Sequence, residues 1–268
     1  LEAIPETAIL ALEDAGDSDG DGISGRAHRV IDPVSGETRL GRFGYKAATT
    51  SVKHQVAAAF NTDMGVMTAM LPTPDCGANQ TDCSTGPQLP EQQLADLVKY
   101  ISLLGVRPQR DYNNPQVLQG KAVFSNIGCN GCHVESFQTS EYHPLAELRN
   151  QTIRPYTDLL LHDMGPGLAD NLAEGEAGGA EWRTAPLWGL GLSACVTGGV
   201  AGNTGWDAFG LDGYQYCTPD ANYLHDGRAR TIDEAIRWHG GEAELSRLSY
   251  QNLPAAEKTA LLAFLNSL

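Results

Sequence analysis

Cys129, Cys132 and His133 have the residue types and the spacing that attach a c-type haem covalently. The two thiols of a C-x-x-C-H motif form thioether bonds with the haem vinyl groups, and the adjacent histidine gives the iron an axial nitrogen. A C-x-x-C pair without that histidine could equally be a zinc ligand pair, a redox-active dithiol or a disulfide. Because His133 directly follows the second cysteine, the motif favours haem c.

A haem ligated by the histidine of the motif keeps a second axial position, for which the sequence offers these candidates: His143, His162, Met164, His225 and His239. Thr231 and Glu234 form a capping box, so a helix is expected to begin at Thr231. His239 is then expected in the last turn of that helix, on its apolar face. An imidazole on an apolar face needs a polar partner, and iron is the partner we expect. Met164 and His162 are the alternatives if His239 is not a ligand.

Asp17, Asp19 and Asp21 place carboxylates at alternate positions before a glycine, as in the first half of an EF-hand calcium loop. The second half does not match, because His28 stands where an EF-hand has its bidentate glutamate. A solvated acidic turn without a metal explains the same residues. The three aspartates are therefore candidate calcium ligands outside a regular EF-hand.

Helices are expected to position these residues. Apolar residues at helical spacing mark four segments: 51–61, 88–104, 117–127 and 253–268. The second and fourth segments align when the chain is shifted by 164 positions, which matches Leu89-Pro90 with Leu253-Pro254. This similarity indicates an internal repeat, although two amphipathic helices could share it by chance.

The repeat suggests two units, and the fold class that we expect is all-α, with cytochrome c-like domains and long loops. Residues 1–111 would be the C-terminal part of a first cytochrome c-like domain, and residues 112–268 a complete haem c domain. Residues 1–128 contain no C-x-x-C-H motif. The haem motif of the first domain is therefore expected upstream of this sequence.

Charge and cysteine content bear on partners and on location. A formal net charge of −15 argues against nucleic acid, whose phosphates attract basic surfaces. No apolar run is long enough to span a membrane. Two further pairs, Cys76 with Cys83 and Cys195 with Cys217, are expected to form disulfides, the alternative being free buried thiols. Disulfides and covalent haem attachment both indicate an exported, periplasmic protein.

Five further stretches accompany the haem motif: residues 21–26 (DGISGR), 41–46 (GRFGYK), 159–170 (LLLHDMGPGLAD), 181–191 (EWRTAPLWGLG) and 223–241 (YLHDGRARTIDEAIRWHGG). Together they resemble the di-haem oxidoreductase family, which also carries a thiol oxidoreductase label and is related to bacterial di-haem cytochrome c peroxidases and MauG-type enzymes. The resemblance covers essentially the whole chain, but only the C-terminal part of a family member. No free reactive cysteine supports the thiol label.

The resemblance implies a six-coordinate, electron-transferring haem in the second domain. In the related peroxidases its distal ligand is a methionine eight residues after the Ser or Thr that opens the helix, a position held here by His239. Two histidine ligands would give a lower reduction potential than a His/Met pair. The same count from Ser51 reaches Ala59, which cannot bind iron, so a haem in the first domain would have an open side. In cytochrome c domains, a helix like the one with Gly120 and Phe124 crosses the C-terminal helix.

We therefore expect a c-type haem electron-transfer unit of a periplasmic di-haem peroxidase-like oxidoreductase, with no catalytic residue yet evident. The alternative is a simple c-type cytochrome that carries electrons and has no substrate of its own, so enzyme activity is an open question. Haem c is the expected cofactor, one in this chain and a second in the full-length protein, with Ca2+ as a further candidate. The expected partner is a redox protein or a second haem domain.

Overall fold

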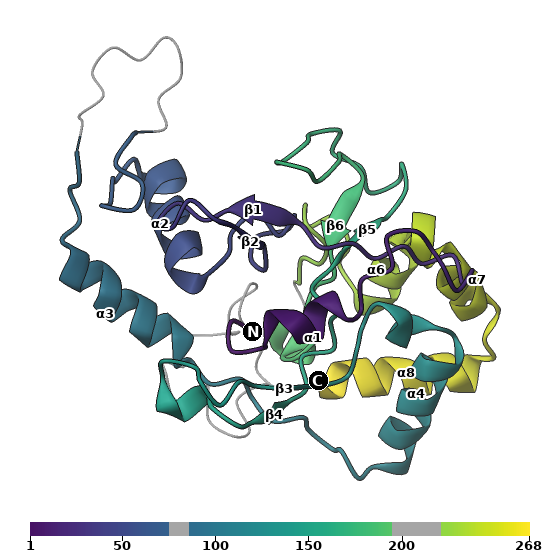
Figure 1. Cartoon of the computed structure of the whole chain (residues 1–268). Coiled ribbons are helices and arrows are strands. Elements are labelled where there is room, and N and C mark those ends of the chain that lie inside the picture. Colours follow the sequence, from purple (N-terminus) through teal and green to yellow (C-terminus); the bar gives the residue numbers. More distant parts are fainter. Residues whose placement is uncertain (75–85, 195–220) are drawn as a thin grey trace.

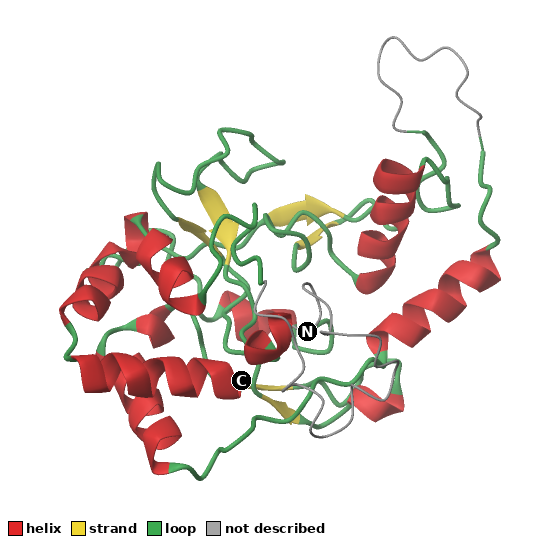
Figure 2. Cartoon of the chain, turned by 180° about the vertical axis from the view of Figure 1, so that it is seen from behind, coloured by secondary structure: helices red, strands yellow, loops and turns green. Residues whose placement is uncertain are grey.

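The computed structural model describes residues 1–74, 86–194 and 221–268, so the predicted disulfides Cys76–Cys83 and Cys195–Cys217 lie outside the described residues. Helices gather towards two sides of the molecule, and loops and short strands connect them (Figures 1 and 2). In chain order the elements are α1 (Glu6–Leu10), β1 (Arg29–Ile31), β2 (Thr38–Leu40), α2 (Val52–Met64), α3 (Glu91–Ser102), α4 (Pro115–Asn126), the 3-10 helix η1 (Cys129–Gly131), β3 (Phe137–Gln138), η2 (Ala146–Leu148), β4 (Thr152–Ile153), β5 (Leu161–Asp163), β6 (Glu181–Arg183), η3 (Leu190–Leu192), α6 (Ile232–Trp238), η6 (Gly241–Ala243), α7 (Glu244–Asn252) and α8 (Ala255–Ser267).

The fold mixes helices with β-structure, so the all-α expectation is wrong. The described residues contain three antiparallel two-stranded sheets, which pair β1 with β2, β3 with β4, and β5 with β6. Each strand has two or three residues, too few for the alternation of polar and apolar residues that marks a strand in a sequence. The partners β5 and β6 also lie far apart in the chain, so only tertiary contacts bring them together.

The helices themselves are close to those expected, and α2 and α6 begin in the same way. The hydroxyl groups of Ser51 and Thr231 each accept the backbone N–H three residues further on, at 3.0 Å. A turn closed by an isolated bridge precedes each cap: Phe43 with Thr49 and Tyr223 with Ala229. The helices α3 and α8 each follow a proline in the same extended conformation. These matching features support the internal repeat, which stays a prediction.

The helices α4 and α8 cross at Gly120, as the resemblance implied (Figure 1). A Cβ atom on Gly120 would lie 1.9 Å from a backbone carbonyl oxygen of α8 and 2.7 Å from Cβ of Phe264. One turn later, Phe124 packs edge-to-face on Phe264 and Tyr156, with ring centroids 5.4 and 6.0 Å apart. These rings belong to the hydrophobic core that packs against Cys129. The crossing therefore builds the core beside the haem motif.

The N-terminal segment packs on the middle of the chain. Ile4, Ile9 and Leu40 share a hydrophobic core with Phe137 and neighbouring apolar residues of the segment 159–160. A backbone bridge also joins Arg26 to the first residue of β5. Residues on both sides of position 111 thus contribute to one core, and the division into 1–111 and 112–268 stays a prediction.

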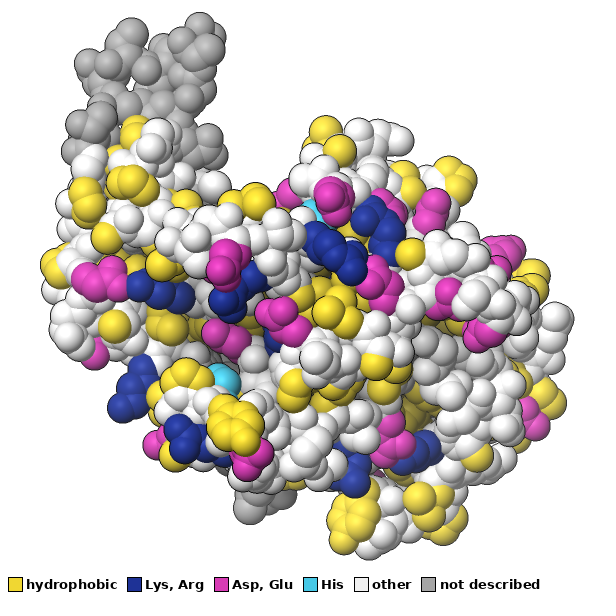
Figure 3. Space-filling model, in the orientation of Figure 1, with side chains coloured by type: hydrophobic (Ala, Val, Ile, Leu, Met, Phe, Trp, Pro, Cys, Tyr) yellow, Lys and Arg dark blue, Asp and Glu magenta, His cyan; other side chains and the backbone are white. Residues whose placement is uncertain are grey.

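In the part of the chain that the structure describes, no helix combines the length and the apolar character needed to cross a bilayer. On the face drawn in Figure 3, basic side chains alternate with acidic ones. The ion pairs of the described residues include Arg29 with Glu13, at 2.9 Å.

Candidate functional site

The two cysteines of the haem motif lie on one short turn after α4. Gly128 ends the helix with a left-handed φ of 86°, and the turn η1 closes when the His133 N–H donates to the carbonyl of Cys129 at 3.0 Å. Both cysteines are free and partly buried. Burial raises the pKa of both thiols, that of Cys129 to about 12, so each keeps its proton.

His133 and His239 are held in the same way, through Nδ1, so that Nε2 of each ring is available. The Nδ1–H of His133 donates to the carbonyl of Tyr156 at 2.9 Å, and the Nδ1–H of His239 donates to the carbonyl of Ala235 at 2.8 Å. These bonds fix the tautomer of each ring and leave Nε2 with its lone pair, as in metal-ligating histidines. Burial lowers the pKa of both rings, that of His133 to about 4, and His239 contributes to the lowering at His133. Both imidazoles are therefore neutral near pH 7 and keep Nε2 available.

His239 lies immediately after α6 rather than in its last turn. The helix ends at Trp238, and His239 has φ −59° and ψ 131°. The following pair, Gly240-Gly241, lies against the backbone of residues 163–165 and turns the chain away from the helical path. The ring still packs back on the last turn through its hydrogen bond to Ala235. The expectation that His239 belongs to the last turn of the helix was wrong, because the helix ends one residue earlier.

A buried tyrosine fixes α6 on α7. The Tyr250 hydroxyl donates to the carboxylate of Asp233, which is also paired with Arg237 at 2.7 Å. The Tyr250 side chain is fully buried. Its hydrogen bond therefore helps to hold the helix that precedes His239.

We expect Tyr250→Phe to lower the free energy of unfolding by about 1–2 kcal/mol, because it removes a hydrogen bond to a charged group that keeps part of its solvation. Urea unfolding followed by circular dichroism measures this. Tyr142→Phe is the matched control, since the Tyr142 side chain is 83% exposed. Equal stabilities of the two variants would contradict the role given to Tyr250.

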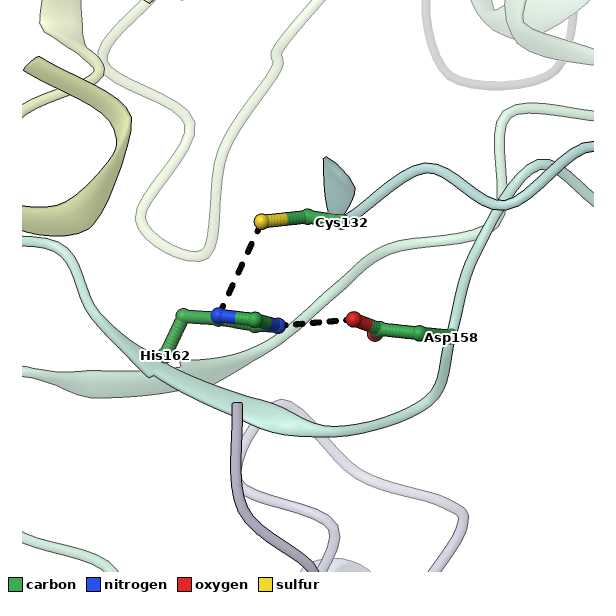
Figure 4. A group of neighbouring side chains, drawn as sticks. All are labelled: Cys132, Asp158 and His162. Carbon is green, nitrogen blue, oxygen red and sulfur yellow. Dashed lines mark hydrogen bonds and ion pairs between the residues drawn. The ribbon is translucent and has the colours of Figure 1, made fainter. Parts of the chain in front are cut away.

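His162, an alternative axial ligand, has no nitrogen to offer. Its ring is 2% exposed, Nε2 lies 2.8 Å from Asp158 and Nδ1 lies 2.7 Å from Glu242. Figure 4 shows the ring between the Asp158 carboxylate and the sulfur of Cys132, which is 3.6 Å from Nδ1. Burial by itself would lower the pKa of His162, but the hydrogen bonds to Asp158, Cys132 and Glu242 raise it to about 12. An imidazolium has no lone pair for a metal, although Cys132, Asp158 and His162 lie close enough to hold one.

The remaining candidates lie elsewhere. His225 stacks on Trp182, with ring centroids 3.6 Å apart and planes inclined by 14°. His143 interacts through Nδ1 with the backbone of Leu145. The Met164 N–H donates to a backbone carbonyl between β5 and β6, and its half-buried side chain is the alternative ligand that keeps a lone pair.

The predicted calcium ligands do lie together. One carboxylate oxygen from each of Asp17, Asp19 and Asp21 lies within 4.8 Å of the others. The backbone N–H groups of Gly22 and Ile23 donate to Asp17 and Asp21, so hydrogen bonds also stabilise this exposed turn. Acidic turns of this kind occur with and without a metal, and calcium binding stays a prediction.

Sequence reasoning missed three residues around the site: Tyr156, Asp158 and Glu242. Tyr156 acts through its backbone carbonyl, which no side-chain pattern reveals. Asp158 precedes the stretch 159–170 and Glu242 follows the stretch 223–241. The glycine pair before Glu242 was a usable signal, because consecutive glycines often mark a close backbone approach.

The family model described as "Di-haem oxidoreductase, putative peroxidase" matches residues 1–205 and 199–268. No curated protein and no solved structure matches the chain. The matched ranges include the haem motif at 129–133 and the segment that carries His239.

Proposed function

Because the chain belongs to the di-haem oxidoreductase family, we propose that it binds haem c and transfers single electrons within a peroxidase-like enzyme. Cys129 and Cys132 would anchor the haem, and His133 and His239 would be its axial ligands. The observation that carries the proposal is the matched pair of histidines. Each donates Nδ1–H to a backbone carbonyl and keeps Nε2 free, which is the donor set that haem iron takes.

The bound haem would supply reversible one-electron chemistry at its iron. The residues of this chain hold that group and limit its reactivity. The sulfur and the proton of each cysteine thiol add across one vinyl double bond, which gives a thioether without a further reactant. Two imidazoles on the iron would exclude peroxide from both faces, and they favour a lower potential than a His/Met pair. This site is therefore suited to electron transfer and not to peroxide binding.

We place the family's second haem beside a cavity of about 1130 Å³. Its lining includes three residues of the first repeat: Phe43, Val52 and Ile101. Their counterparts in the second repeat belong to or pack on the core beside Cys129: Tyr223, Ile232 and Leu265. Tyr156 also lines the cavity, while its carbonyl accepts the hydrogen bond of His133. The repeat thus favours a second redox centre within reach of the first.

An exported, periplasmic location completes the proposal. Bacteria attach haem c outside the cytoplasm, so a functional haem motif requires export. Fractionation of the native host tests this point, and recovery of holoprotein from the cytoplasm would contradict it.

The double variant Cys129→Ser, Cys132→Ser tests the attachment. The wild-type protein, exported in a host that matures c-type cytochromes, should keep its haem in a denaturing gel and show a c-type pyridine haemochrome spectrum. The double variant should lose the covalent haem completely, because serine forms no thioether. A wild-type protein that carries zinc instead of haem would overturn the proposal.

The same spectrum counts the haems in the product of the complete gene. Two haems, one of them high-spin and reactive with peroxide, would support the enzyme. One low-spin haem that is inert to peroxide would identify a simple electron carrier.

A further inference from the structure

Three of the distinctive stretches meet around His162. Its ring is contributed by the stretch 159–170, and the stretch 21–26 lies directly on it, since a Cβ atom on Gly25 would be 2.7 Å from the ring. The third stretch, 223–241, ends one residue before Glu242, whose carboxylate bonds Nδ1 of His162 at 2.7 Å. The sequence alone does not predict that these three stretches meet at His162.

The carboxylate of Glu242 is saturated with hydrogen bonds. It accepts the N–H of Ser24 at 3.0 Å, the hydroxyl of Ser24 at 2.9 Å and the N–H of Asp163 at 3.0 Å, in addition to the bond from His162. These donors come from the N-terminal segment and from β5. Glu242 therefore ties three separate parts of the chain together, three residues after His239.

The backbone that joins Glu242 to His239 also lies tightly on β5. A Cβ atom on Gly241 would be 2.1 Å from the carbonyl oxygen of Asp163, and Gly241 has a left-handed φ of 55°. A Cβ atom on Gly240 would be 3.1 Å from the carbonyl oxygen of Met164. The segment from His239 to Glu242 thus packs on β5 and the residue after it so closely that a side chain at Gly241 would not fit.

On its other side, His162 is connected to Cys132, one of the two proposed haem anchors. Its Nε2 bonds Asp158 at 2.8 Å, and the backbone N–H of Asp158 donates to the carbonyl of Cys132 at 2.9 Å. Nδ1 of His162 also lies 3.6 Å from the sulfur of Cys132. A continuous set of buried contacts therefore runs from Cys132 through Asp158, His162 and Glu242 to the segment of His239.

We propose that His162 and Glu242 are positioning residues, which hold the distal ligand His239 at a fixed distance from the anchor Cys132. This inference rests on the proposed haem site. The two axial histidines belong to segments far apart in the chain, and a loose segment after α6 would let His239 leave the iron. The hydrogen bond between His162 and Glu242 holds the segment after α6 against the part of the chain that carries Cys132.

The test uses Glu242→Gln in the full-length holoprotein. The amide nitrogen cannot accept the hydrogen bonds that one carboxylate oxygen now takes, so the segment should loosen. We expect a high-spin fraction in the oxidised absorption spectrum and binding of carbon monoxide to the reduced haem that is faster by about ten-fold or more, the range in which partners of metal ligands act.

The matched control is Glu181→Gln. The Glu181 side chain is 20% exposed, pairs with Arg26 at 2.5 Å and accepts the backbone N–H of Gly178, so its hydrogen bonds go to other parts of the chain than the segment of His239. This variant should lose stability and keep a fully low-spin haem. The milder variant Ser24→Ala removes one donor to Glu242. Ser24→Ala should also make carbon monoxide binding faster than in the wild-type protein. If Glu242→Gln does not fold, this variant tests the positioning role in its place.

Failure of the positioning role can be distinguished from failure of the proposed function. A haem that stays low-spin, with unchanged carbon monoxide binding in the Glu242 or the Ser24 variant, overturns the positioning role. Absence of covalent haem from the wild-type protein overturns the proposed function instead.

Discussion

Replacing His239 with alanine should convert a low-spin haem into a high-spin one with an open axial position. The His239 ring offers Nε2 only, because its Nδ1–H is held by the carbonyl of Ala235. Removing the ring therefore removes the whole proposed distal ligand. Reduced His239→Ala protein should bind carbon monoxide rapidly, whereas the wild-type protein should bind it slowly, because His239 must first leave the iron. Absorption and electron paramagnetic resonance spectra measure the change.

His225→Ala is the control for this experiment. His225 is also partly buried and lies before the same helix, but it stacks on Trp182. Its loss should leave the spin state unchanged. If His239→Ala stays low-spin, Met164 becomes the expected ligand, since both nitrogens of His162 are engaged by carboxylates.

Gly120→Ala should destabilise the protein by about 3 kcal/mol, the upper range for overpacking a close-packed core. The added methyl group would lie 1.9 Å from a backbone carbonyl oxygen of α8, so the two helices must separate. The gain in helix propensity of about 1 kcal/mol opposes this effect without cancelling it. Separation would also disturb the contact of Phe124 with Phe264, and with it the core beside Cys129.

Thermal and urea unfolding of the holoprotein measure the loss. Gly105→Ala is the matched control, because a Cβ atom there meets nothing within 4 Å. We expect it to be neutral. The crossing would not depend on Gly120 if the two alanine variants were equally stable.

The two repeats differ at the ligand position for a local reason. In the second repeat, Gly240-Gly241 follows the position, so α6 ends and His239 leaves the helix. In the first repeat the counterpart is Ala59, and α2 continues past it to Met64. The second repeat thus has a histidine just after its helix, whereas the first has a partly buried alanine within a continuous helix. This difference agrees with the proposal of one closed haem site and one with an open side.

The sequence by itself determined the features that depend on neighbouring residues. The haem motif is local, because the two sulfurs and the proximal nitrogen must reach one porphyrin. The caps at Ser51 and Thr231 are local as well, because a hydroxyl group satisfies an N–H three residues away. For the same reason the helices were predictable, whereas the helix crossing at Gly120 followed from the family resemblance.

Only the tertiary structure decided what depends on distant partners. His162 and His239 both occur among apolar residues, and the sequence left both as ligand candidates. Their roles diverge because Asp158 and Glu242 fold onto the first, whereas a carbonyl of its own helix holds the second. The short sheets were missed because strands of two or three residues exist only through their pairing partners. Hydrogen bonds between remote segments, which no local pattern encodes, therefore separate the proposed ligand His239 from the proposed positioning residue His162.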